Sequence, residues 1–215
     1  MPVMVLEGDA IRPLGGGAVW AQWTDGNILA GEPVAAGSGV ARAVWSGWLV
    51  DEEGQRDPRT WGAAGWEALL RRLEMLVAEG AGEILVRTHH AHAVSDVPSS
   101  QRLLRAWEGR PGRVRLIVDV GAMIAPSMLD AAEDHVARVL ESLAGAEGVA
   151  AVVASSVLAE GGPAPLDRGA VGGEVIARLI GRLVPPRVPL ILLGNGAAGT
   201  ADQGLGLLAG LPHVS

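Results

Sequence analysis

Two hydrophobic periods alternate along residues 66–193 of this chain of 215 residues. Apolar residues three and four positions apart in 66–79 predict an amphipathic helix, and the short apolar run EILV after it predicts a buried strand. The alternation recurs, with helices predicted over 98–107, 127–144 and 174–184 and strands over 114–120, 148–157 and 188–193. Repeated strand–helix units predict a parallel sheet covered by helices, as a (βα)8 barrel or an open doubly wound sheet.

Residues 1–60 follow a different pattern. Short β-like segments (PVMVL, AVWAQW and ARAVWSGWLV) are separated by Gly-rich turns, without a long amphipathic helix. Six of the seven Trp residues fall between positions 20 and 66. We therefore predict an α/β fold in a single domain, 1–215. Residues 61–215 form a TIM-barrel-like array of βα repeats, which is incomplete or has a reduced N-terminal half built from the Gly- and Trp-rich residues 1–60.

The composition excludes several classes of protein. The net charge is −7 and no basic patch is present, which argues against a nucleic-acid partner. No apolar run reaches the roughly 18–20 residues of a membrane span, and the N-terminal run lacks the basic start of a signal peptide. There is no Cys, hence no disulfide or thiolate chemistry. We expect a soluble cytoplasmic protein without a membrane partner or cofactor, and we keep a homo-oligomer as an open alternative.

Three histidines follow the strand over 83–88, at the edge where α/β folds carry their active sites. His89, His90 and His92 are compatible with a metal site, a substrate-contacting loop or a solvated loop without a ligand. A zinc site would need further ligands, such as Asp96 or Asp119. We predict no metal, and we name Asp119, His89 and His92 as the candidate acid–base residues, since Asp119 ends the next strand.

Small-residue turns follow three of the strands. GNGAAG (194–199) matches G-x-G-x-x-G, but too few residues remain after it for a dinucleotide-binding unit. Backbone N–H groups in such turns hold phosphate, although each turn is equally compatible with a plain tight turn. The phosphate-binding residues predicted in these turns are Ser155, Ser156, Gly194 and Gly196. They imply a small anionic substrate.

Part of the chain, residues 45–161, resembles the histidine-biosynthesis (βα)8 barrels: the cyclase subunit of imidazole glycerol phosphate synthase and its sister sugar-phosphate isomerase. The similarity lies in SGW (46–48), GAGEILV (80–86), LIVDVGAM (116–123) and GVAAVVASSVLAEG (148–161). The resemblance implies a sugar-phosphate-binding barrel with isomerase or cyclase activity. The chain departs from the family after GAGEILV, where His89 and Ala91 stand in place of a catalytic aspartate. The Gly-Gly pair of the family's phosphate loop is reduced to Gly121, for which the resemblance implies phosphate binding.

Two other hypotheses remain. PLDRGAV (165–171) and Asp119 are similar to features of xylose-isomerase-like sugar-phosphate isomerases and epimerases, which use metal ligands from several strand ends. Arg87 stands here where such a ligand would be expected. The last hypothesis is a barrel relative without catalytic activity that acts as a binding or assembly protein. It rests on the Trp-rich N-terminal part, because Trp is favoured at interfaces.

Overall fold

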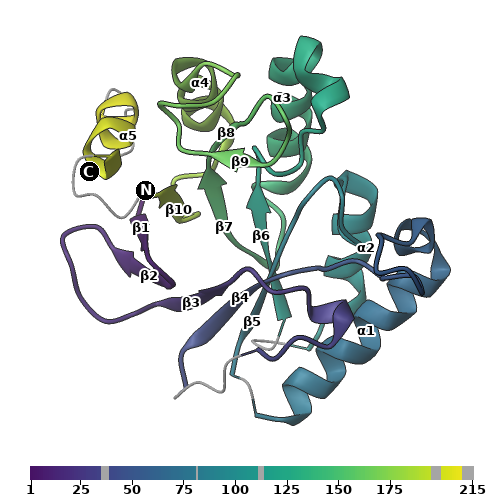
Figure 1. Cartoon of the computed structure of the whole chain (residues 1–215). Helices are drawn as coiled ribbons and strands as arrows, with labels where there is room; N and C mark the ends of the chain where they lie inside the picture. Colours follow the sequence, from purple (N-terminus) through teal and green to yellow (C-terminus); the bar gives the residue numbers. More distant parts are fainter. Residues whose placement is uncertain (35–38, 81, 111–113, 195–199, 210–215) are drawn as a thin grey trace.

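Eight strands close into a barrel in the computed structural model, which describes residues 1–34, 39–80, 82–110, 114–194 and 200–209 (Figure 1). The strands are β1 (Val3–Glu7), β2 (Ala10–Pro13), β3 (Ala21–Thr24), β4 (Ala41–Trp45), β5 (Ile84–Arg87), β6 (Val114–Asp119), β7 (Val149–Ala154) and β10 (Leu190–Leu193). Their order around the barrel is β1-β10-β7-β6-β5-β4-β3-β2. The parallel pairing of β1 with β10 joins the first and last strands and thereby closes the barrel.

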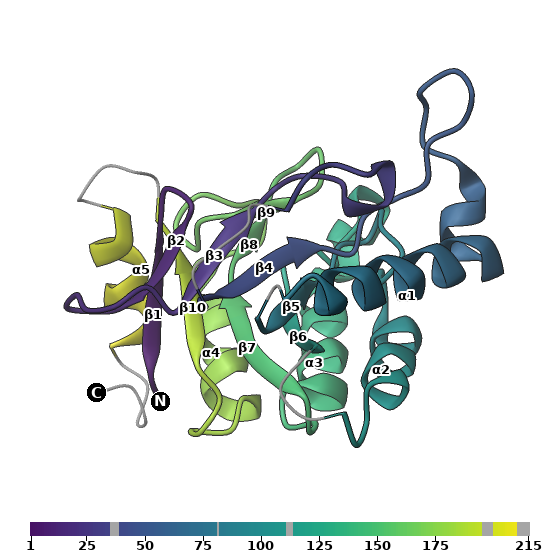
Figure 2. The same cartoon turned by 90° about the horizontal axis from the view of Figure 1, so that it is seen from below.

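Helices cover only part of this barrel. The five α-helices of the described residues are α1 (Ala63–Ala78), α2 (Val97–Ala106), α3 (Ala132–Leu143), α4 (Gly173–Leu183) and α5 (Thr200–Leu208). Figures 1 and 2 show α1 to α4 outside the β4–β7 side, and α5 beside β10 and α4. None of the helices in the described ranges is long and apolar enough to cross a membrane.

The N-terminal strands are connected differently from the rest. β2 pairs antiparallel with both β1 and β3, whereas the other neighbours in the barrel are parallel. Between β1 and β4 the described residues hold one short 3-10 turn, η1 (Ile28–Ala30), and no α-helix. The α/β barrel prediction is therefore confirmed in its coarse form: the barrel is closed, but it is mixed and has too few helices for a complete (βα)8 array.

The helix predicted over 127–144 is wrong in its first third. The 3-10 helix η3 (Pro126–Ala131) occupies the start of the predicted helix, so that α3 begins only at Ala132. Another 3-10 helix, η2 (Pro58–Trp61), precedes α1. Neither η3 nor α3 has a side-chain cap at its N-terminus. The strand predicted over 148–157 also divides at Ser155, after which β8 (Ser156–Val157) pairs with β9 (Pro163–Ala164).

Two apolar clusters hold the fold together, one between the sheet and the helices and one inside the barrel. The second follows from the strand period of two, because alternate residues face the interior. It includes Ile11, Trp23, Ala43, Leu85, Ile117 and Ile191. Alanines on β3, β4 and β7 leave interior room for large side chains from the same strands. This interior ends in a layer of polar groups at the carboxyl ends of the parallel strands.

Candidate functional site

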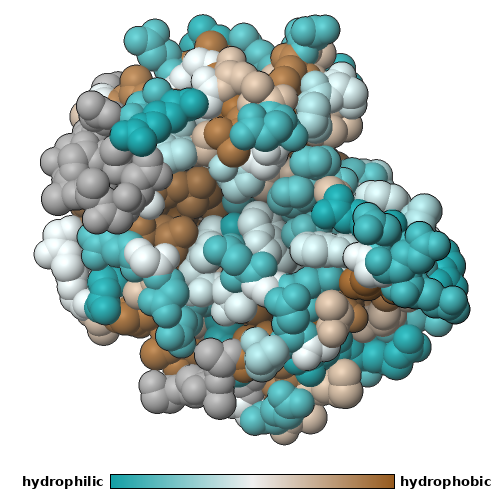
Figure 3. All heavy atoms as spheres, viewed as in Figure 1, coloured by the Kyte–Doolittle hydropathy of each residue, from teal (hydrophilic) through white to brown (hydrophobic). Residues whose placement is uncertain are grey.

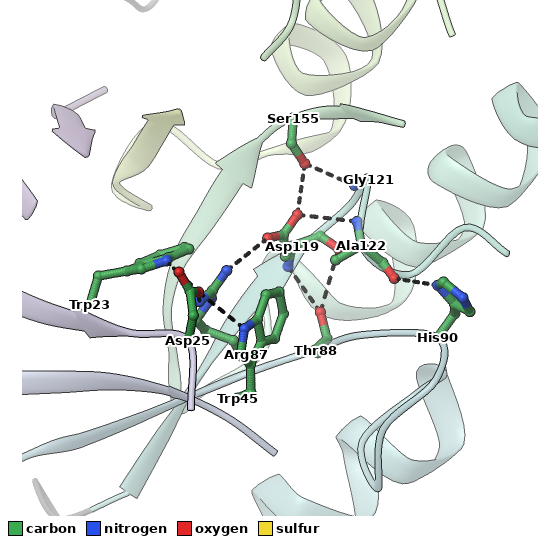
Figure 4. A network of polar contacts seen from close by, with 10 residues as sticks. All are labelled: Trp23, Asp25, Trp45, Arg87, Thr88, His90, Asp119, Gly121, Ala122 and Ser155. Atoms are coloured by element: carbon green, nitrogen blue, oxygen red, sulfur yellow. Dashed lines mark hydrogen bonds and ion pairs between the residues drawn. The ribbon is translucent and has the colours of Figure 1, made fainter. Parts of the chain in front are cut away.

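The polar layer is built by residues that continue the inward-facing pattern of five neighbouring strands (Figure 4). Trp23, Trp45, Arg87 and Asp119 lie at the carboxyl ends of β3, β4, β5 and β6, and Ser155 directly follows β7. All five are buried, and Arg87 is the largest of the fully buried side chains. In α/β barrels this end of the sheet carries the active site, so these residues form the candidate site.

Arg87 is enclosed by two indole rings. Its guanidinium carbon lies 3.2 Å from the ring centroid of Trp23 and 3.3 Å from that of Trp45. A planar, weakly hydrated guanidinium stacks well on aromatic faces, which stabilises a buried arginine that has few other partners. Arg87 Nη1 donates to Asp25 Oδ1 at 2.9 Å, Nη2 lies 3.8 Å from Asp119 Oδ2, and Nε has no hydrogen-bond partner.

Asp25 accepts hydrogen bonds from three side chains with a single oxygen. Trp23 Nε1 and Trp45 Nε1 each donate to Oδ1 at 3.1 Å, beside the bond from Arg87. The three donors are buried, whereas the side chain of Asp25, just after β3, is 74% exposed. Asp25 is therefore the solvent-facing side of an otherwise buried cage.

Asp119 belongs to a second, fully buried network. Its Oδ1 accepts from Ser155 Oγ at 2.7 Å and from the amide of Ala122 at 3.2 Å. Its own amide donates to Thr88 Oγ1 at 2.9 Å, which ties β6 to β5. Oδ2 has no hydrogen-bond partner and faces Arg87. Oδ1 is thus held in place by hydrogen bonds, whereas Oδ2 is buried without one.

Burial dominates the protonation of both charged groups. It lowers the pKa of Arg87 to about 10, against the opposing effect of Asp119 and Asp25, so the guanidinium stays charged at neutral pH. Burial also raises the pKa of Asp119, with Arg87 and the bond from Ser155 opposing the change. A carboxyl group with a raised pKa is better matched to general acid–base catalysis than an ordinary aspartate.

The histidines form a stack beside this network. The rings of His89 and His92 lie 4.3 Å apart and those of His89 and His90 lie 4.5 Å apart, with Trp45 edge-on to the first pair. Burial, then the other histidines and nearby arginines, lowers the pKa of His89 to about 3 and that of His92 to about 2. Both rings are neutral at pH 7. Within the described residues no hydrogen bond joins them to Asp119.

The stacked arrangement also bears on the metal hypothesis. Across the described residues no group of three or more His, Asp or Glu side chains is placed to hold a metal ion. Asp96, considered above as a further ligand, caps α2 instead: its Oδ1 accepts from the amide of Ser99 at 2.8 Å and from Ser99 Oγ at 2.6 Å.

The predicted phosphate-binding donors are engaged within the protein. The amide of Gly121 donates to Ser155 Oγ at 3.0 Å, Ser156 Oγ donates to the carbonyl of Val171 at 2.5 Å, and the amide of Gly194 donates to the carbonyl of Leu6 at 3.2 Å. Gly196 lies outside the described residues. A phosphate at these turns would have to replace existing bonds, so their role remains a prediction.

The sequence analysis missed Asp25 and the two tryptophans as site residues and treated Arg87 only as a departure from a ligand pattern. A signal was present: Trp23 ends the β-like segment AVWAQW, Trp45 lies inside the segment ARAVWSGWLV, and Arg87 ends the run EILVR at an inward position of the strand. A charged residue at the end of an apolar strand indicates a buried partner. Its carboxylate partner, 62 positions away in sequence, was not recognisable from spacing.

The surface over this end of the barrel is mainly polar or neutral in the view of Figure 3, with a hydrophobic area beside the grey residues.

Compared with models of known protein families and with curated protein sequences, the chain has no match.

Proposed function

We propose that this chain is a sugar-phosphate-binding barrel with isomerase- or cyclase-type acid–base chemistry, related to the histidine-biosynthesis barrels that its sequence resembles. The observation that carries the proposal is the pairing of a buried carboxyl group, Asp119, with a buried cation, Arg87, at the carboxyl ends of the strands. Such a pair supplies a proton donor and an anion-binding group at one place.

Asp119 is the proposed acid–base residue. Ser155 and the amide of Ala122 fix its Oδ1, which leaves Oδ2 to exchange a proton with a substrate oxygen or carbon. Burial raises the pKa of this carboxyl group, which makes it a stronger proton acceptor than an ordinary aspartate. Arg87 provides positive charge 3.8 Å away, which would stabilise a developing enolate or alkoxide.

His89 and His92 take a narrower part in this proposal. With pKa values near 3 and 2, both histidines are weak bases at neutral pH. We therefore assign proton transfer to Asp119, and we assign to the two histidines hydrogen bonding to the substrate and packing against it. The phosphate group of the substrate would lie at the small-residue turns or at Arg87. Variants of the turns and of Arg87 distinguish these two positions, because only variants at the true position weaken substrate binding.

The test is exchange of substrate hydrogen with solvent. Ribose 5-phosphate and ribulose 5-phosphate are incubated with the protein in D₂O, and deuterium at the carbon next to the carbonyl is followed by NMR, because isomerisation through proton transfer places solvent hydrogen there. We expect Asp119→Asn to slow exchange by about 10²–10⁴-fold while the ligand-induced shift in melting temperature remains. Full exchange in this variant would remove Asp119 from the mechanism.

A binding protein without catalytic activity is the second candidate. The observation in its favour is that Gly121, Ser156 and Gly194 use their donors internally, so part of the expected phosphate cradle is occupied. In that case ribose 5-phosphate neither raises the melting temperature of the wild type nor incorporates deuterium. No observation in the described residues favours the metal-dependent, xylose-isomerase-like alternative.

A further inference from the structure

Three buried N–H donors converge on one point near the protein surface. Trp23 Nε1, Trp45 Nε1 and Arg87 Nη1 lie 3.1, 3.1 and 2.9 Å from the same oxygen, Asp25 Oδ1. We call these three side chains the donor cage. They are fixed by the barrel, since each comes from a strand and packs on the others, whereas Asp25 follows the last residue of β3.

The charge and the hydrogen bonds of the donor cage are better matched to an oxyanion than to a neutral group. The guanidinium is positive at neutral pH, and the indole groups donate but do not accept hydrogen bonds. Arg87 Nε and Asp119 Oδ2 have no hydrogen-bond partner in the protein. Water does not replace such a partner, because Arg87 is 1% and Asp119 0% exposed. A ligand that reaches past Asp25 would therefore meet unsatisfied polar atoms as well as the donor cage.

Asp25 is attached to this cage less firmly than its bonds suggest. Its side chain is largely in water, and an exposed carboxylate regains hydration when it rotates away. The donors cannot do the same, because they are buried and would be left unsatisfied. Exchange of Asp25 for another oxyanion therefore preserves the interactions of the buried groups and costs only those of an exposed side chain.

We propose that the donor cage is an oxyanion-binding site, and that Asp25 occupies it until a carboxylate or phosphate oxygen of the ligand replaces it. The inference rests on the proposed function only for the identity of the ligand as a sugar phosphate; the oxyanion site itself follows from the cage. Asp25 thereby acts as an internal competitor that sets how tightly the anion binds.

Anion rescue tests this proposal. Asp25→Ala exposes the cage, so we expect its melting temperature to fall by several degrees in sodium chloride and to recover by at least half, saturably, when acetate or phosphate replaces chloride at constant ionic strength. The matched control is Glu133→Ala, which removes the carboxylate partner of Arg178 on the surface, where both groups are more than half exposed. That variant keeps Asp25 in the cage, so acetate and phosphate should stabilise it far less than they stabilise Asp25→Ala.

Asp25→Asn serves if the alanine variant does not fold, since its amide oxygen still accepts the three hydrogen bonds. We expect it to bind phosphate at least tenfold more tightly than the wild type, as measured by tryptophan fluorescence. Better rescue by acetate assigns the cage to a carboxylate ligand, and better rescue by phosphate and ribose 5-phosphate assigns it to a phosphate ester.

The failures of the two proposals are distinguishable. An equal melting temperature of Asp25→Ala in chloride, acetate and phosphate, or unchanged phosphate affinity in Asp25→Asn, overturns the oxyanion site. Rescue by acetate without any stabilisation by ribose 5-phosphate keeps the oxyanion site and overturns the sugar-phosphate ligand.

Discussion

Arg87 illustrates how a single charged residue organises the interior of this barrel. It lies between two indole rings, with a carboxylate on each side, and its side chain is 2% exposed. A lysine would keep the charge but lose the planar stacking and the fork of donors. The site is therefore specific for arginine and not only for a positive charge.

We expect Arg87→Lys to lower the free energy of unfolding by about 2–4 kcal/mol, because a desolvated cation–π contact contributes about 2 kcal/mol and two rings are involved. Urea denaturation followed by circular dichroism measures the change. Arg178→Lys, at an exposed ion pair, should change stability by less than about 0.5 kcal/mol. Equal effects of the two substitutions would show that the indole contacts contribute nothing.

Gly121 gives a second example, in which the residue is explained by space. A Cβ atom built on it would lie 2.0 Å from the carbonyl oxygen of Ser156 and 2.7 Å from Ser155 Oγ. The ends of β6 and β7 therefore approach too closely for any side chain. This is a structural reason for a glycine that the sequence analysis assigned to phosphate binding.

Gly121→Ala should destabilise the protein by about 1–3 kcal/mol, because backbone at the junction of two barrel strands has to move. Gly206→Ala is the control: Gly206 lies in α5 with nothing within 4 Å of its Cβ position, and alanine is the better helix former. Thermal unfolding of both variants decides the matter. A neutral Gly121→Ala would mean that the two strand ends can separate without cost.

Among the elements, the regular helices and strands were predictable and the connections that carry the site were not. The apolar stripe over 66–79 predicted α1 and the run VRLIVDV predicted β6, because long periodic segments reflect which residues are buried. The 3-10 start before α3 and the strand β2 lack such a period. Asp119 was recognised from its strand end, whereas Asp25 follows a strand of four residues and becomes meaningful only through its three-dimensional neighbours.

The loop that carries His89, His90 and His92 should make the protein sensitive to acid. The pKa values of His89 and His92 fall from 6.5 to about 3 and about 2 on folding, so between these values the unfolded chain binds protons that the folded protein does not. The contribution of these two histidines to the free energy of unfolding is therefore fully present above pH 6.5. It decreases as the pH falls toward 3, by up to about 1.4 kcal/mol per pH unit for each group.

Urea denaturation of the wild type between pH 7 and pH 4 tests this sign. His89→Gln and His92→Gln should each reduce the slope of stability against pH, whatever their effect at pH 7. His135→Gln, on α3, is the control and should keep the slope of the wild type. Identical slopes in all three variants would show that the stacked histidines do not contribute to the pH dependence.

The whole molecule depends on contacts between the two ends of the chain. β1 and β10 are neighbours in the barrel although they lie almost 190 residues apart, and their pairing runs in register from Val3 with Leu190 to Leu6 with Leu193. The interior cluster takes residues from all eight strands, including β1 to β3, between which the described residues hold no α-helix. The N-terminal strands are thus stabilised from within the barrel, and not by a helix layer as in the other half.

This arrangement predicts that the barrel interior and the helix layer unfold together. Ile11→Ala removes a fully buried interior side chain on β2 and should cost about 2–5 kcal/mol, whereas Leu14→Ala, at a residue that is 45% exposed, should cost far less. The fluorescence of a variant that keeps Trp23 and Trp45 and carries Phe at the other five tryptophan positions reports on the candidate site. This signal and far-ultraviolet circular dichroism, which reports on the helices, should give one transition in every case. If Ile11→Ala instead shifts the fluorescence transition while the helical signal unfolds as in the wild type, the N-terminal strands form a separately unfolding unit and the candidate site is built on the less stable half of the barrel.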